Sequence, residues 1–462
     1  MTRENPADLL PELCVLGTAV AGLLTGSFLP RTRQWIVAVL CGTGLVAGLV
    51  TAGLAARRAD LTTFDAFMLD PLTHVTRIVV TAATLLVIGL AAGPLRGHRR
   101  ESEFHTLLML AALGTIVLGA ASDLLVLVAA YLLAGIPGYV LAGFGKDAPG
   151  TEAALKYYLM GAFLGILMLA GVTLLFGLGR GTSYETLAAG LGTAPGGAVA
   201  VGVVLLLAGL MFKAGAVPAH FWVPDVTEGA PRVVAAFVTT VPKIGAFAAL
   251  YRFAVQALPP GRDDWPLLVA VIAAATMTLG NLAAFAQRNV RRLLAYSTIS
   301  QAGYLLVPIA MAGRTDLAEP ALLFYLAGYA VTNLGAFAVV IAVGRDDLLA
   351  YTGLARRSPL LAVSLVVCLL GLVGTPPTAV FVGKLLIFGA ALDGHYTWLA
   401  VAAAVNSVAS VFYYLRWIVP MMRRRDGGGE RRPAPSARWI AYAAAGGSLV
   451  LGIGAGIPLA IG

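Results

Sequence analysis

Lysine is rare in this sequence, and most of its lysines stand where a charge is costly. Of 32 basic residues in the 462-residue chain only five are lysines, and Lys213, Lys243 and Lys384 each lie well inside a long apolar run. An ammonium group in hydrocarbon is costly unless it is paired, hydrated or neutral, so such residues are typically functional. Arginine stays protonated at any accessible pH, whereas burial can bring a lysine close to neutrality. We therefore predict that these three lysines take up and release protons.

The alternative for a lysine in a membrane protein is that its stem lies in the apolar layer while its amine reaches water. Lys156 stands near the start of its apolar run and fits this alternative as well as it fits a proton path. Prolines accompany two of the deeper lysines, because Pro218 follows Lys213 and Pro376-Pro377 precedes Lys384. Proline removes a backbone donor, which membranes tolerate only where protein or internal water satisfies the freed groups. The pattern predicts two broken helices, each with a buried amine beside it.

The composition predicts that membrane-spanning helices position these residues. The chain is 59% hydrophobic and 12% charged, with a mean hydropathy of +0.86, whereas soluble domains carry about 25% charged residues. Apolar runs long enough to span a bilayer recur from end to end. We predict about fourteen spans, near residues 10–29, 34–55, 70–92, 105–121, 123–144, 154–178, 199–217, 232–256, 265–286, 292–312, 320–344, 359–391, 397–422 and 438–461.

The spacing of the two breaks indicates an internal repeat. The 359–391 run is too long for one straight span and forms the second broken helix, five spans after the first. Five is an odd number, so the second copy would be inverted in the membrane, as in many transporters. The expected fold class is an all-α polytopic membrane protein with two inverted five-helix repeats. The expected domains are 1–104 (three N-terminal helices), 105–256 (first repeat), 257–422 (second repeat) and 423–462 (a loop and a last helix).

Loop charges predict the orientation of the chain. We number the loops between the predicted spans in order along the chain. The even-numbered loops hold little beyond Arg57, Arg58, Arg180, Arg262 and Arg314. Cytoplasmic loops are enriched in basic residues, which places the odd loops in the cytoplasm and both termini outside. This asymmetry explains the net charge of +9 better than nucleic-acid binding does. The odd loops hold Arg31, Arg33, Arg96, Arg99, Arg100, Lys146, Arg232, Arg288, Arg291, Arg292, Arg345, Arg356, Arg357, Arg423 to Arg425, Arg431 and Arg432.

The sequence offers no site for a metal or a redox centre. Cys14, Cys41 and Cys368 stand singly inside apolar runs, so disulfides, zinc and iron–sulfur clusters are unsupported. The longest polar stretch is a loop near 423–438, too short to fold as a soluble domain. A nucleotide or redox cofactor would therefore have to lie on another chain.

Seven ordered motifs carry a resemblance to a known family. Through these motifs the chain resembles the antiporter-like membrane subunits of bacterial respiratory complex I (NADH-quinone oxidoreductase), which are related to cation/proton antiporters. The resemblance covers about residues 100 to 420. VPDVTEGAP and a lysine at position 384 are most similar to subunit N. The motifs are EAALKYYLMGA, GLMFKAGAVPAHFWVPDVTEGAP, VPKIGAFAAL, NVRRLLAYSTISQAGYLL, FYLAGYAVTNLGAFAVV, GTPPTAVFVGKLLIFGAAL and NSVASVFYYLRW.

The resemblance implies a non-redox membrane-arm subunit of a proton-pumping NADH:quinone oxidoreductase, a translocase. It implies proton transfer along a mid-membrane lysine and water axis, coupled to quinone reduction elsewhere in the complex. Lys213, Lys243 and Lys384 match the family lysines of the seventh, eighth and twelfth helices. No cofactor is expected on this chain; NAD, FMN, iron–sulfur clusters and quinone are implied in partner subunits. The implied partners are the other antiporter-like and small membrane subunits and the lipid bilayer, in the bacterial inner (plasma) membrane.

Two positions depart from the family pattern. The family usually has a glutamate in the fifth helix that pairs with the lysine of the seventh, and YLLAGIPGYVLAG places Leu132 there. Gln301 replaces a histidine usual in the tenth helix, and an amide can order water but cannot titrate at physiological pH. Two alternatives therefore stay open: a subunit of a cation/proton antiporter, and a non-pumping structural subunit of the arm.

Four other polar residues are candidates for proton transfer or for structure. His220, Asp225 and Glu228 follow Pro218 and could form the mouth of a half-channel, but for the two acids we favour a role in ordering the loop. Asp123 precedes an apolar run, so it is either a helix N-cap or a point of proton uptake.

Overall fold

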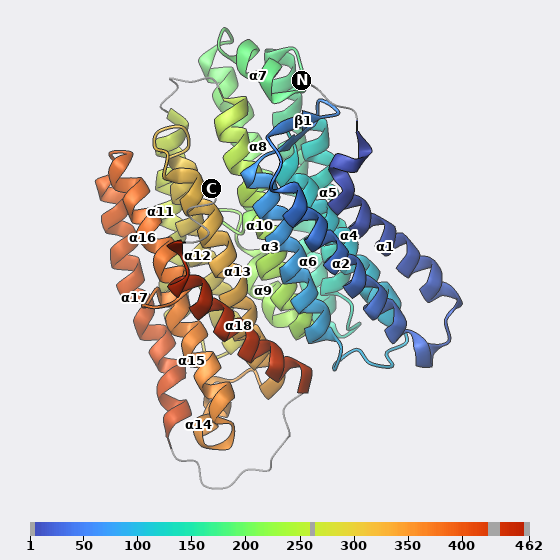
Figure 1. Cartoon of the computed structure of the whole chain (residues 1–462). Coiled ribbons are helices and arrows are strands. Elements are labelled where there is room, and N and C mark those ends of the chain that lie inside the picture. The colour runs from blue at the N-terminus through green and yellow to red at the C-terminus, as the bar shows by residue number, and fades with distance from the viewer. Residues whose placement is uncertain (1–4, 259–263, 424–434, 457–462) are drawn as a thin grey trace.

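The computed structural model describes residues 5–258, 264–423 and 435–456, which form a bundle of helices (Figure 1). The α-helices are α1 Leu10–Phe28, α2 Trp35–Ala55, α3 Pro71–Ala91, α4 Glu101–Ala120, α5 Leu124–Ala142, α6 Ala148–Gly179, α7 Tyr184–Leu191, α8 Gly196–Ala214, α9 Trp222–Gly229, α10 Arg232–Arg252, α11 Asp264–Phe285, α12 Val290–Ala310, α13 Ala318–Val343, α14 Leu354–Arg357, α15 Pro359–Val373, α16 Ala379–Asp393, α17 Thr397–Met422 and α18 Pro435–Ile453. Shorter elements are the 3₁₀ turns η1 Pro6–Leu9, η2 Arg31–Arg33 and η4 Leu348–Tyr351, the π-helical turn η3 Phe253–Ala257, and the strands β1 Leu61–Thr63 and β2 Phe67–Leu69.

The predicted spans agree with the helices of the structure. Within the described residues, twelve helices are long and apolar enough to cross a bilayer, and each coincides with one predicted span. The predicted span 359–391 is built from α15 and α16, of 15 residues each. The last predicted span, 438–461, corresponds to α18 and continues beyond the described residues. The expectation of an all-α polytopic membrane protein is confirmed, apart from the small antiparallel hairpin in which β1 pairs with β2.

Both predicted breaks are present, and a glycine ends the helix at each of them. Gly215 follows α8 with φ of 70°, and Gly374 follows α15 with φ of 89°. In this left-handed conformation the chain turns back to bond the last helix carbonyls, and glycine adopts it without a clash of Cβ. The prolines named above come three and two residues later, so they prevent the helix from restarting at once.

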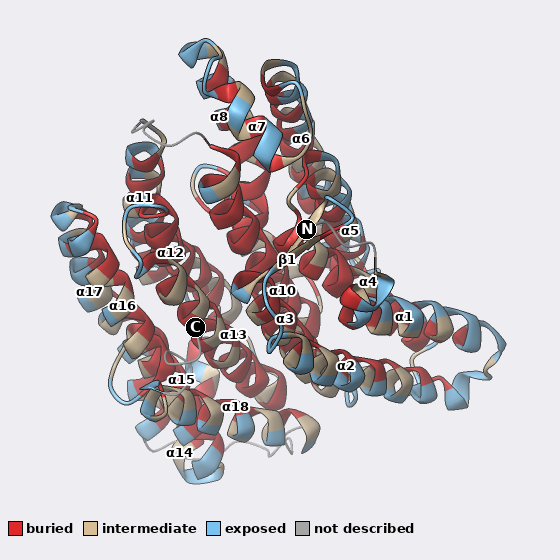
Figure 2. Ribbon diagram, turned by 45° about the horizontal axis from the view of Figure 1, so that its top comes forward, coloured by how far each residue is buried: buried red, intermediate tan, exposed pale blue. Residues whose placement is uncertain are grey.

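Three helices form the buried centre of the bundle. Figure 2 shows α10, α12 and α13 almost wholly buried, whereas α1 and α2 at one side are largely exposed. The exposed side chains of α1 and α2 include large apolar ones such as Leu24 and Val50, which suits contact with lipid. Two of the three candidate lysines project from or against this buried centre, as described below.

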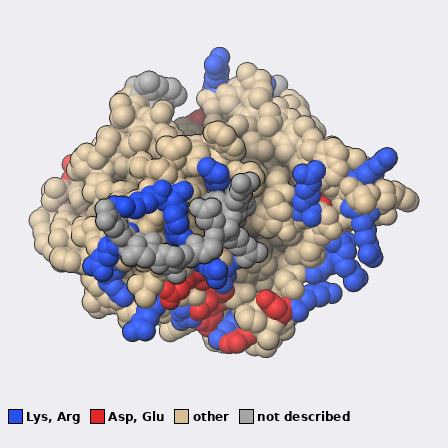
Figure 3. All heavy atoms as spheres, turned by 90° about the horizontal axis from the view of Figure 1, so that it is seen from below, with Lys and Arg blue, Asp and Glu red and all other residues tan. Residues whose placement is uncertain are grey.

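The loops alternate between the two ends of the bundle, as the predicted spans require. At one end, Arg232 and Arg291 both bind Asp346, which joins the starts of α10 and α12 to the loop after α13. At the other end, Arg252 binds Asp70, which joins the end of α10 to the start of α3. Figure 3, seen from below, shows lysine and arginine side chains gathered around the end that carries the odd loops. Which end faces the cytoplasm stays a prediction from this charge asymmetry.

The proposed domain limits fall close to element ends but not always between elements. The limit at 104/105 lies inside α4, which begins at Glu101, and the limit at 256/257 lies inside η3. The limit at 422/423 coincides with the end of α17. The division into two inverted repeats stays a prediction.

Candidate functional site

Lys213 lies at the end of α8, buried against α5. Its side chain is 1% exposed, and its Nζ lies 4.5 Å from the centroid of the Tyr131 ring. Among the described residues this Nζ has no hydrogen-bond partner. Gly135 of α5 provides the room, because a Cβ at that position would lie 2.8 Å from the same Nζ. The amine is therefore enclosed by α5 and faces an aromatic ring instead of a carboxylate.

Lys243 lies in the middle of α10 and is also 1% exposed. Its Nζ donates a hydrogen bond of 3.1 Å to the backbone carbonyl of Thr298 on α12. The same amine packs against Gly215, where a Cβ would lie 3.0 Å from Nζ. Gly215 comes two residues after Lys213. The break after α8 therefore makes room for the amine of Lys243 close to the backbone that carries Lys213.

Lys384 lies on α16, directly beyond the second break, and is 3% exposed. Its Nζ donates to the carbonyl of Val373 at 2.8 Å and to Oγ of Ser407 at 2.9 Å. It also lies 4.0 Å from the centroid of the Tyr304 ring. Val373 is the last residue of α15, where carbonyls lack helical partners and carry partial negative charge. The broken helix thus supplies an acceptor for the ammonium that an unbroken helix would not have.

Both Lys243 and Lys384 contact α12. Thr298, Gln301 and Tyr304 follow one another at intervals of three residues, which places them on one side of the helix. Between the two ends of this face, Gln301 donates from Nε2 to the carbonyl of Leu372 at 2.9 Å and accepts from the hydroxyl of Tyr325. Thr298, Gln301 and Tyr304 therefore form a row of polar residues on α12, with the acceptor of Lys243 at one end and the ring beside Lys384 at the other.

Leu132 does not hold the position that the sequence motif indicated. Its side chain is 44% exposed, on the outer side of α5, whereas Tyr131 is 1% exposed and faces Lys213. A carboxylate at position 132 would therefore point away from Lys213, contrary to the expectation from the motif. The reason is rotational: consecutive helix residues project about 100° apart, so a shift of one residue changes the face.

Lys156 lies apart from the buried lysines. Its side chain is 45% exposed, and Nζ binds Glu152 at 2.7 Å and Asp225 at 2.8 Å. These contacts are those of a lysine that reaches the interface, which was the structural alternative for this residue.

His220 and Asp123 lie in different parts of the structure. His220 lies in the break between α8 and α9; it is 6% exposed, packs on Phe221, and its Nδ1 has no partner among the described residues. Asp123 caps α5, since Oδ1 accepts from the backbone N–H groups of Leu125 at 2.7 Å and Val126 at 3.2 Å. The N-cap interpretation of Asp123 is confirmed, and a role for either residue in proton transfer stays a prediction.

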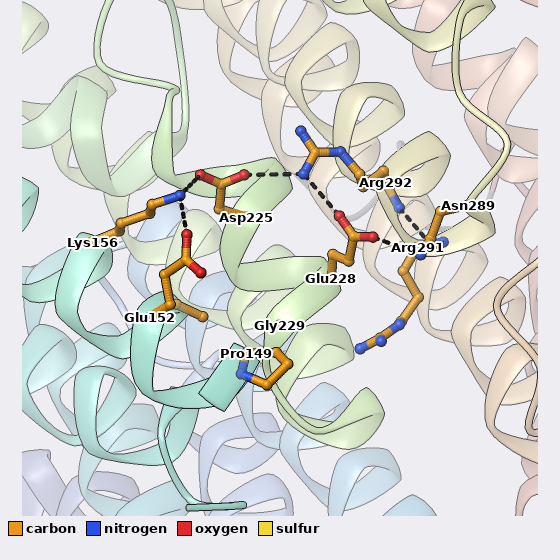
Figure 4. A pocket seen from close by; sticks show the side chains of 10 residues that line it. Pro149, Glu152, Lys156, Asp225, Glu228, Gly229, Asn289, Arg291 and Arg292 are labelled. Atoms are coloured by element: carbon orange, nitrogen blue, oxygen red, sulfur yellow. Dashed lines mark hydrogen bonds and ion pairs between the residues drawn. The ribbon is translucent and has the colours of Figure 1, made fainter. Parts of the chain in front are cut away.

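A pocket of about 350 Å³ opens between α6, α9 and α12 at the end that carries the odd loops (Figure 4). Asp225 binds Lys156 on one side and Arg292, at 3.0 Å, on the other. Glu228 binds Arg292 at 2.8 Å and accepts from Asn289 at 2.9 Å. The two acids therefore hold α9 to its neighbours, as the loop-ordering interpretation expected.

The pKa of Asp225 responds to these contacts. Burial by itself would raise the pKa of this carboxyl, but the hydrogen bonds from Lys156 and Arg292 outweigh burial and hold the pKa below its ordinary range. Asp225 therefore stays ionised at neutral pH and keeps both ion pairs.

Sequence reasoning missed the tyrosines that face the lysines. Tyr131 and Tyr304 were not singled out, because a tyrosine in an apolar run resembles any other core aromatic. A usable signal is the small-residue face of α5, where Tyr131, Gly135 and Gly138 recur at helical spacing and mark a side with room for a long neighbour. Across the described residues, no group of three or more histidines, cysteines and acids is placed to hold a metal ion.

In sequence, the chain is similar to proteins of one family over nearly its whole length. Residues 121–410 match the model of the family described as NADH:quinone oxidoreductase/Mrp antiporter, TM. NADH-quinone oxidoreductase subunit N 1 of Streptomyces griseus is 55% identical over 99% of this chain and 98% of that protein. NADH-quinone oxidoreductase subunit N of Mycobacterium sp. (strain JLS) is 51% identical over 98% of this chain and 97% of that protein.

Solved structures share the same arrangement of helices. A chain of respiratory complex I from Thermus thermophilus with bound aureothin matches with a TM-score of 0.84 and 33% identity, over 97% of this chain and 98% of that chain. A chain of the Mrp complex from Dietzia sp. DQ12-45-1b matches with a TM-score of 0.83 and 22% identity, over 99% of this chain and 95% of that chain. At 22% identity, the match to the Mrp complex shows a shared fold alone.

Proposed function

The chain belongs to the family of NADH-quinone oxidoreductase subunit N, and from that membership we propose that it translocates protons through its buried lysines as a membrane-arm subunit. The observation that carries the proposal is the row of polar groups on α12, which begins at the acceptor of Lys243 and ends at the ring beside Lys384. Three amines buried to 3% exposure or less, to which no carboxylate of the described residues is hydrogen-bonded, are costly unless each can give up its proton.

In this mechanism the lysines exchange protons along the middle of the membrane. An ammonium at one site disfavours an ammonium at the next, because like charges in a medium of low polarity repel. A proton that arrives at one lysine therefore promotes release from its neighbour, and the group titrates as a coupled set. The amine of Lys243 donates to one carbonyl, and the amine of Lys384 donates to a carbonyl and a hydroxyl. Either lysine can therefore release its proton without breaking an ion pair.

The chemistry that drives this exchange lies on other chains in our proposal. NAD, FMN, iron–sulfur clusters and quinone would be bound by partner subunits, and the partners would be the other antiporter-like and the small membrane subunits of the arm. The chain would lie in the bacterial plasma membrane with the odd loops in the cytoplasm, in line with the basic residues at that end.

Alanine variants of the lysines test the proposal. The assembled complex carrying Lys213→Ala, Lys243→Ala or Lys384→Ala is placed in vesicles, and protons moved per NADH oxidised are measured. We expect each variant to lose the share of protons that this subunit carries, because a methyl group cannot hold a proton. Lys146→Ala is the matched control, since Lys146 is an exposed loop lysine.

The same experiment separates the alternatives. Unchanged proton yield in all three variants would favour a non-pumping structural subunit. Sodium-dependent transport by the chain in the absence of NADH oxidation would favour a cation/proton antiporter instead.

A further inference from the structure

Lys213 is the candidate lysine for which the described residues supply no hydrogen-bond acceptor. What faces its amine is the ring of Tyr131, at 4.5 Å, and this ring is itself 1% exposed. Gly165 of α6 packs against the ring edge, where a Cβ would lie 3.4 Å from Cε1 of Tyr131. The ring is therefore held between α6 and the amine.

The second broken helix repeats this arrangement. Lys384 lies over the ring of Tyr304, at 4.0 Å. Tyr131 lies on the second helix of the first proposed repeat, α5, and Tyr304 on the second helix of the second, α12. In both repeats the lysine next to the break therefore lies over a tyrosine from the equivalent helix.

We propose that Tyr131 takes the place of a carboxylate as the partner of Lys213, and that its ring positions and stabilises the protonated amine during proton transfer. This inference rests on the proposed function and adds a residue to it. A ring that is shielded from water stabilises a cation over its face. It can raise the population of the protonated amine by about thirtyfold. A ring also has no proton to exchange at neutral pH, so the proton on Lys213 can move only to another lysine or to water.

The ring, and not the hydroxyl, carries this role. The hydroxyl of Tyr131 is buried and has no partner among the described residues, while the ring face is what the amine contacts. Tyr131→Phe should therefore keep most of the function, and Tyr131→Leu should lose it. Gly135→Ala should lose it as well, because its Cβ would displace the amine from the ring.

The test measures protons moved per NADH oxidised by the assembled complex in vesicles. We expect Tyr131→Leu to lose the same share of protons as Lys213→Ala, Tyr131→Phe to retain it, and the double variant Tyr131→Leu/Lys213→Ala to lose no more than either alone. Leu132→Ala is the control, since it truncates an outward-facing side chain on the same turn. If Tyr131→Leu prevents assembly, Gly135→Ala in the same measurement decides.

Two outcomes overturn the inference without touching the proposed function. The first is loss of pumping in Lys213→Ala with full pumping in Tyr131→Leu or Gly135→Ala. The second is equal loss in Tyr131→Phe and Tyr131→Leu, which would assign the role to the hydroxyl. Unchanged pumping in Lys213→Ala would instead contradict the proposed function at this site, and the inference with it.

Discussion

The side-chain amide of Gln301 on α12 binds the end of α15, the first half of the second broken helix. Its Nε2 donates to the carbonyl of Leu372, and its Oε1 accepts from Tyr325. Gln301→Leu would leave both groups buried and unpaired, at a cost of about 1–3 kcal/mol. We expect a lower temperature of heat inactivation for the purified complex that carries this variant.

Gln301→His is the matched comparison, because an imidazole N–H can still donate to the helix end. The histidine variant should be closer to the wild type than the leucine variant. Equal stability of the leucine variant and the wild type would show that the amide does not hold α15 in place.

Individual residues show which features of the site could be predicted from the sequence and which could not. The depth of Lys213, Lys243 and Lys384 could be predicted, because an apolar run on both sides of a residue implies burial. Their partners could not, since Thr298 is 55 positions from Lys243 and Leu132 was assigned to the wrong face of α5 by one residue. Burial follows from local composition, but contact depends on helix rotation, which a run of uniformly apolar residues leaves undetermined.

Among the elements, α9 combines a buried apolar side, which includes Trp222 and Val226, with ion pairs to two neighbouring helices. This eight-residue helix continues the chain after the first break, and Asp225 ties it both to Lys156 of α6 and to Arg292 of α12. Asp225→Asn removes the charge from both ion pairs, and because the side chains are partly exposed we expect a loss of only about 1 kcal/mol at pH 7.

The pH dependence of this loss has a definite sign. The pKa of Asp225 is lowered in the folded chain, so its contribution is fully present above the ordinary aspartate pKa of about 4 and is lost as the pH falls through the lower folded value. The difference in stability between the wild type and Asp225→Asn should therefore be constant from pH 7 to about 5 and disappear only in stronger acid. A difference that already vanished near pH 6 would contradict the ion-pair explanation.

The elements themselves were the most predictable part of the fold. Hydropathy locates the spans because a bilayer demands long apolar runs, and the breaks follow from proline chemistry. The short elements α7, α14 and the hairpin of β1 and β2 were not predicted, because each depends on contacts with parts of the chain distant in sequence. An example is the backbone bond from Ser122 to Ala66 beside that hairpin.

Over the whole molecule, the charge asymmetry between the two ends makes a prediction about orientation. Basic side chains gather at the end that carries the odd loops, so this end should face the cytoplasm (Figure 3). Leu349 lies at that end, in the turn η4 between α13 and α14, and is 70% exposed. Ala56 is exposed at the opposite end, after α2. Neither residue is charged, so a cysteine at either position leaves the loop charges unchanged.

Labelling of these cysteines with a membrane-impermeant maleimide in intact cells and in inverted vesicles measures the orientation. We expect Ala56→Cys to react in intact cells and Leu349→Cys only in inverted vesicles. The native chain is a suitable background, because Cys41 and Cys368 are fully buried and Cys14 lies within the apolar helix α1. The reverse pattern would place the basic end outside and would contradict the orientation predicted from the loop charges.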